Sequence, residues 1–154
     1  MQIKSIFATI LAATVVTAAP TAEESTDAQP YVILNMMEIG TQWTIGNFKR
    51  ACGPADKQCT LTYNIEANDG SPAAKCSYQV IGSPASRASY SNVKCGAYTV
   101  SSSWSGQFGA GKGFTTMSVV KGNLIAYPSY TDKQLQGGTV VKPDQSYTPQ
   151  NLPS

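Results

Sequence analysis

The sequence predicts an all-β domain, either a single antiparallel β-barrel or a closed sandwich, with roughly 8–10 short strands and two disulfides. Three observations predict this class. Short segments alternate apolar and polar residues, turn-forming residues separate these segments, and no stretch has the length and periodicity of a long helix. A chain of 154 residues is expected to hold one domain, and no internal repeat is visible.

The first residues have the layout of a cleavable secretory signal. Lys4 precedes an apolar run at 6–16, and small residues follow it. The run is too short to span a bilayer, and the polar segment after it disfavours the alternative of a membrane anchor. Cleavage is predicted after Ala18, with Ala19 as the alternative site, so the protein is expected to be secreted and extracellular. The predicted division of the chain is a signal peptide at 1–18, a flexible N-terminal arm at 19–30, a β-barrel domain at 31–141 and a flexible C-terminal tail at 142–154.

The first strands are expected before the first cysteine. Residues 31–39 are rich in β-formers and predict a strand, with a short helix as the alternative. In the next strand Trp43 and Ile45 share one face, and Trp43 is expected in the core rather than as a ligand platform. Phe48 falls on the opposite parity, so Gly46 is expected to permit a β-bulge that turns Phe48 inward.

The later strands follow the same alternation. The clearest is 60–67, where Leu61, Tyr63 and Ile65 share one face and polar residues share the other. Residues 131–137 predict a single helical turn. The remaining strands are expected at 76–80, 90–95, 98–104, 114–120, 124–127 and 140–141.

Four cysteines in a small secreted chain predict two disulfides. Three pairings are possible. The preferred one joins sequence neighbours, Cys52 with Cys59 and Cys76 with Cys95, because each pair brackets a plausible loop and a strand-rich segment lies between the pairs. The second bridge is expected to clamp a hairpin.

Charge and residue types exclude several function classes. The chain has 11 Lys and Arg against 9 Asp and Glu, and Lys4 leaves with the signal, so neither nucleic acid nor a charged membrane surface is expected as a partner. With no histidine present, Ser-His-Asp and Cys-His centres and imidazole metal sites are absent. No cofactor or metal is expected. A carboxylate-pair hydrolase would depend on Glu38 and Glu66, and Glu66 lies on the polar side of its strand, so no enzyme is expected.

The glycine-rich segment 106–113 matches the spacing of a phosphate-binding loop through Lys112. Gly113, however, stands where Ser or Thr would hold magnesium. A β-segment rather than a helix follows the loop. The sequence therefore predicts a flexible hairpin loop and no nucleotide site.

Aromatic residues near this loop form the candidate partner-binding surface. Aromatic side chains in loops stack on sugars or anchor protein partners. For Trp104 the alternative is a core position at the end of its strand. The candidate residues are Trp104, Phe108, Lys112, Tyr127 and Tyr130.

Several motifs resemble the small secreted fungal elicitors called hypersensitive-response-inducing proteins. They are WTIGNF, CGAYTVSSSWSGQFG, GFTTMSVV and IAYPSYTDKQLQGGTVVKPDQSYTPQNLP, and the similarity runs from about Trp43 to Pro153. The resemblance implies a fungal effector that binds a protein at the plant cell surface or in the apoplast and triggers a hypersensitive defence response without catalysis. The alternative is a glycan-binding or cell-wall-associated module.

A weaker resemblance reaches the family of the Alternaria major allergen. It rests on a W-x-I-x-x-F stretch made by Trp43, Ile45 and Phe48, followed by Cys76 and by Cys95 with its neighbouring glycine. This resemblance implies a single β-barrel with intramolecular disulfides. The dimer-forming cysteine of that family precedes the tryptophan, and here no cysteine does, so a monomer is expected.

Overall fold

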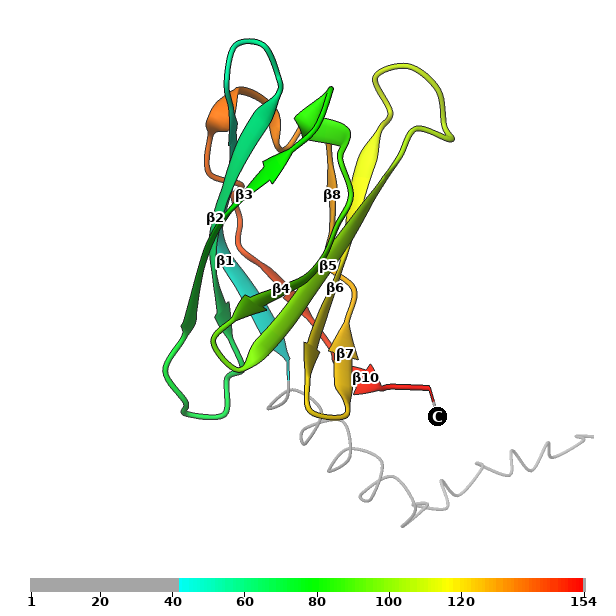
Figure 1. Ribbon diagram of the computed structural model, residues 1–154. Coiled ribbons are helices and arrows are strands. Elements are labelled where there is room, and N and C mark those ends of the chain that lie inside the picture. The colour runs from blue at the N-terminus through cyan, green and yellow to red at the C-terminus, as the bar shows by residue number, and fades with distance from the viewer. Residues whose placement is uncertain (1–41, 154) are drawn as a thin grey trace, which may run out of the picture.

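The computed structural model describes residues 42–153, which fold into two antiparallel β-sheets that face each other (Figure 1). The predicted signal peptide, N-terminal arm and strand at 31–39 lie outside the described residues. Short 3-10 helices, η1 (Ala85–Arg87) and η2 (Gln136–Gly138), lie in connections. The strands are β1 (Trp43–Cys52), β2 (Gln58–Glu66), β3 (Ala74–Ile81), β4 (Tyr90–Cys95), β5 (Tyr98–Ser105), β6 (Phe114–Lys121), β7 (Leu124–Ala126), β8 (Ser129–Thr131), β9 (Gln145–Tyr147) and β10 (Gln150–Asn151).

The strand order makes the domain a sandwich. One sheet has the order β3-β2-β1-β9, and the other has the order β10-β7-β6-β5-β4, with β8 also pairing β6. No strand pairing joins the two sheets within residues 42–153. The chain passes from the first sheet to the second after β3, returns to the first sheet for β9 and ends in the second with β10. The all-β prediction is confirmed, and the single barrel, which the allergen resemblance also implied, is wrong.

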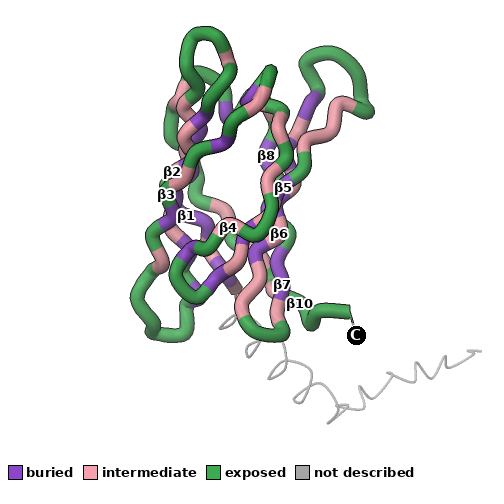
Figure 2. Tube along the Cα trace, in the orientation of Figure 1, coloured by how far each residue is buried: buried purple, intermediate pink, exposed green. Residues whose placement is uncertain are grey.

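The core lies between the sheets, as the buried positions in Figure 2 show. In β2 the period-two pattern holds, with Leu61, Tyr63 and Ile65 buried. In β1 the ladder to β2 shifts register between Gly46 and Lys49. That shift is the predicted bulge, and it brings Phe48 inward, where its side chain is only 1% exposed.

Five aromatic rings form a row that starts and ends in the six-stranded sheet. Tyr130 of β8 stacks on Phe48 of β1 at 4.4 Å, and Phe48 stacks on Tyr63 of β2 at 5.0 Å. Tyr78 of β3 then meets Tyr63 and Tyr90 of β4 edge to face. The hydroxyl of Tyr78 donates to that of Tyr90 at 2.6 Å and lies 3.0 Å from that of Tyr63. The row therefore joins the two sheets through packing and hydrogen bonds.

Both predicted disulfides are present. Cys52 and Cys59 face each other in the β1–β2 ladder and close its loop. Cys76 lies in β3 and Cys95 at the end of β4, with their Cα atoms 5.2 Å apart. Because β3 and β4 belong to different sheets, this bridge links the sheets instead of clamping a hairpin, which corrects the expectation.

The last residues are also part of the fold. The sequence predicts a flexible tail at 142–154, but β9 pairs with β1 and β10 pairs with β7. Asp144 fixes this segment to the bulge by accepting hydrogen bonds from the Asn47 amide at 3.0 Å and from Lys142 at 2.9 Å. Of the three prolines that suggested a loose tail, Pro149 separates two short edge strands, Pro143 precedes the first and Pro153 follows the second.

The connection before this segment agrees in part with the prediction. The amide of Leu135 donates to the carbonyl of Thr131 at 3.2 Å, which makes the predicted single helical turn. The predicted strand at 140–141 is reduced to one bridge between Val140 and Lys49. Thr131 belongs to β8, which the sequence did not predict.

Candidate functional site

A groove of about 1260 Å³ opens at one end of the sandwich. Four separate segments line it: the end of β1 with the loop that follows, η1, the end of β5 with the glycine-rich loop before β6, and the connection that contains η2. Figure 1 shows these segments at the same end of the two sheets. We call this feature the end groove.

The floor of the end groove is a hydrogen-bonded trio. After the β1 bulge, Arg50 points inward and is only 8% exposed. Its guanidinium lies 3.5 Å from Asp132 and donates to the carbonyl of Ser86 at 2.7 Å. The indole of Trp104 donates to the other oxygen of Asp132 at 2.9 Å. Asp132 therefore joins the two sheets at this end by binding side chains from β1 and β5.

Arg50 is incompletely paired. Its Nε is buried and has no hydrogen-bond partner among the described residues. Buried polar groups are usually satisfied, and an unpaired donor in a polar groove points to water or a ligand as its partner.

The ring of Trp104 is held in place on several sides. The guanidinium of Arg87 lies 4.8 Å over the ring, a cation–π contact. A Cβ atom at Gly106 or Gly113 would overlap the indole, so glycine is required at both positions for the loop to approach it. Trp104 is thus half-buried and positions Arg87 and Asp132, rather than offering a free stacking face.

The end groove carries an excess of positive charge. Four of its lining side chains are cationic and two are carboxylates. Both carboxylates already have partners: Asp132 as above, and Asp56, which accepts from the amide of Ser86 at 2.8 Å. The cationic residues are Lys49, Arg50, Arg87 and Lys133.

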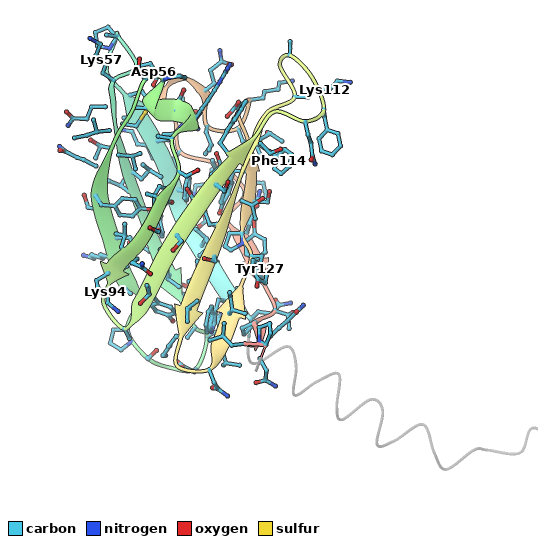
Figure 3. All side chains as sticks on the ribbon, turned by 45° about the vertical axis from the view of Figure 1, so that its right-hand side comes forward. Asp56, Lys57, Lys94, Lys112, Phe114 and Tyr127 are labelled. Carbon is cyan, nitrogen blue, oxygen red and sulfur yellow. A yellow bond between two sulfur atoms is a disulfide. The ribbon has the colours of Figure 1, made fainter. Side chains whose placement is uncertain are left out.

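The predicted site residues do not come together. Trp104 lies in the end groove, while Phe108 and Lys112 lie on the glycine-rich loop between β5 and β6, exposed and not among the residues that line the groove. Figure 3 places Lys112 on that loop and Tyr127 farther down the sandwich. Tyr130 is 1% exposed and stacked on Phe48, so its ring packs in the core and leaves almost no surface for a partner. The strand that holds Tyr130, β8, is not among the strands that the sequence predicts.

A second, shallower hollow of about 460 Å³ lies beside Tyr127. Its lining is mostly serine and threonine, from β5 and β6, including Ser101, Ser103 and Thr116, and from β4 and the residue before it. Tyr127 is 50% exposed there. This surface has hydroxyl groups but no charged side chain in its lining.

The described residues hold one cluster with metal-ligand side chains and one of the two candidate catalytic glutamates. Cys52, Asp56 and Cys59 lie close together, but the two sulfurs are bonded to each other and offer no thiolate. Glu66 is exposed on its strand, and Glu38 lies outside the described residues. Among residues 42–153, no helix has the length and apolar character needed to cross a membrane.

Sequence reasoning missed Arg50, Arg87 and Asp132. The predicted bulge could have identified Arg50. The bulge reverses which residues of β1 face inward, so Arg50, two residues after Phe48, faces inward as Phe48 does. Arg87 and Asp132 lie in connections, where alternation carries no information. Their meeting with Trp104 depends on three contacts between distant segments.

Comparisons with known proteins match almost the whole described domain. The family model described as Effector TSP1 matches residues 44–152. A curated protein named Effector TSP1, from Hypocrea virens, is 44% identical over 157 residues, which cover 99% of this chain and 100% of that protein. The match includes both sheets and every segment that lines the end groove.

Proposed function

The chain belongs to the Effector TSP1 family, and on this premise we propose that it is a secreted fungal effector that binds a partner at the plant surface or in the apoplast. Binding triggers a defence response of the hypersensitive type, without catalysis. The chain reaches the apoplast through its N-terminal signal at residues 1–18. It acts as a monomer.

The observation that supports binding at a defined place is the end groove. Its main side chains are fixed before any partner arrives, since Asp132 holds Arg50 and Trp104, and Trp104 holds Arg87. Preorganised groups lose little conformational entropy on binding. The groove also lies among loops at one end of a disulfide-linked scaffold, where recognition residues commonly lie.

Infiltration of leaf tissue tests this function. The purified, oxidised protein is expected to cause local cell death and defence-gene induction, because a folded recognition surface should suffice for detection. The control is the same protein after reduction and alkylation, which removes both disulfides. Absence of a response across several host species would contradict the elicitor role.

A glycan-binding module is the second candidate function. The hydroxyl-rich hollow beside Tyr127 favours it, because an exposed tyrosine and serine hydroxyls can contact a sugar ring. Pull-down on chitin and β-glucan tests this candidate. A Tyr127→Ala variant that binds as well as the parent would remove that surface from consideration.

A further inference from the structure

We propose that the end groove binds an acidic oligosaccharide through the carboxylate groups of the sugar. This proposal rests on the proposed function, because it names the class of ligand that binds at the same site. The proposed contacts are made by Arg87, Lys49 and Lys133. Arg50, Asp132 and Trp104 form the floor beneath them, and the ring of Trp104 positions Arg87. A polymer of uronic acids is the ligand class that fits.

The charge distribution supports an anionic ligand. The chain has only 11 Lys and Arg in total, and four of them line this one groove. Arg87 is exposed, and its recorded contact is with the indole of Trp104. It forms no ion pair with any residue in the part of the chain that the structure describes. Its planar guanidinium therefore has donors available for a bidentate bond to a carboxylate.

The buried arginine gives an independent indication. Arg50 is more than nine-tenths buried and lies at the floor of the groove, where Nε has no partner among the described residues. Its bonds to Ser86 and Asp132 use two of its five N–H donors. Asp132 balances the charge of Arg50 at the floor, and the positive charge that remains in the groove lies on the lining above it, where Lys49, Arg87 and Lys133 outnumber Asp56 and favour an anion.

The shape supports a chain-like, hydroxylated ligand. The volume of about 1260 Å³ exceeds the roughly 300–1,000 Å³ of typical small-molecule pockets. Glycines at 109, 111, 137 and 138 line the groove. With no side chains in the way, their backbone amide and carbonyl groups can reach ring hydroxyls.

The lining disfavours a peptide. Trp104 and Leu135 are the only large apolar side chains that the described lining contains. Leu135 is 2% exposed, and Trp104 is covered by Arg87. A peptide would find no pocket for an apolar anchor, which peptide interfaces generally require. An acidic sugar needs only cations and polar backbone groups.

Calorimetric titration of the full secreted protein tests the proposal. De-esterified oligogalacturonate is the probe, and the same oligomer with methyl-esterified carboxyls is the matched neutral ligand. Binding is expected for the acidic oligomer, with at least tenfold weaker binding after esterification or on raising the salt concentration. Arg87→Ala is expected to weaken binding about tenfold.

Lys94→Ala is the control variant, since Lys94 is an exposed cation distant from the groove in Figure 3. It should leave affinity unchanged, and thermal unfolding should show that both variants fold. Failure of the acidic oligomer to bind would overturn the proposal. Equal affinity for the esterified oligomer, equal weakening by Lys94→Ala, or equal competition by inorganic phosphate would also overturn it. A leaf response without oligomer binding refutes this inference alone, whereas oligomer binding without a leaf response refutes the proposed function alone.

Discussion

Replacing both Cys76 and Cys95 by alanine is expected to lower the free energy of unfolding by about 3 kcal/mol. The bridge closes a loop between residues 19 positions apart. It also joins β3 to β4, which belong to different sheets and share no ladder. After its loss, core packing, the tyrosine hydrogen bonds and the connecting residues 82–89 still hold the two sheets together at this edge. Equilibrium unfolding in urea measures the change.

The matched control is the double alanine variant of Cys52 and Cys59. Those cysteines are 7 positions apart and already face each other in the β1–β2 ladder, so their bridge restrains the unfolded chain less. A smaller loss is expected for this variant. An equal loss of unfolding free energy in both variants would show that the bridge between the sheets contributes no more to stability than the bridge within the ladder.

Alkaline pH is expected to destabilise the fold steeply. Burial, helped by neighbouring tyrosines, raises the pKa of Tyr63 and Tyr78 in the folded protein, and burial also raises the pKa of Tyr130. In the unfolded chain these phenols titrate near pH 10, at about the ordinary value. Above that pH the unfolded state releases protons that the folded state retains, so the stability present at lower pH is lost as the pH rises.

The size of this effect follows from proton linkage. Each such tyrosine lowers the free energy of unfolding by up to about 1.4 kcal/mol per pH unit above about pH 10. Urea unfolding at a series of alkaline pH values checks this. Tyr78→Phe is expected to reduce the slope, whereas Tyr127→Phe, at an exposed position, is the matched control. An unfolding free energy that stays constant through pH 11 would contradict the prediction.

The local features of the fold could be predicted because they depend on neighbouring residues. Alternation identified the buried face of β2, and the wrong parity of Phe48 identified the bulge beside Gly46. Cysteine spacing led to the correct pairing. These features need no knowledge of which strand lies next to which.

The long-range arrangement could not be predicted in the same way. Alternation shows which face of a strand is buried. Nothing in the residues of β3 and β4, however, indicates that the two strands belong to different sheets. Tyr130 lies after a proline and outside the predicted strands, although it forms one end of the aromatic row by stacking on Phe48. The end groove combines side chains from segments as distant as Arg50 and Asp132, so only tertiary contacts define it.

We propose that the end groove is the surface through which this effector acts. The most direct measurement is the leaf response to a charge-reversed variant, Arg87→Glu with Lys133→Glu, compared with Lys94→Glu at matched protein concentration and with folding verified for each. The groove variant is expected to lose the response, and the Lys94 variant is expected to keep it. A full response to the groove variant would show that the effector does not act through the end groove.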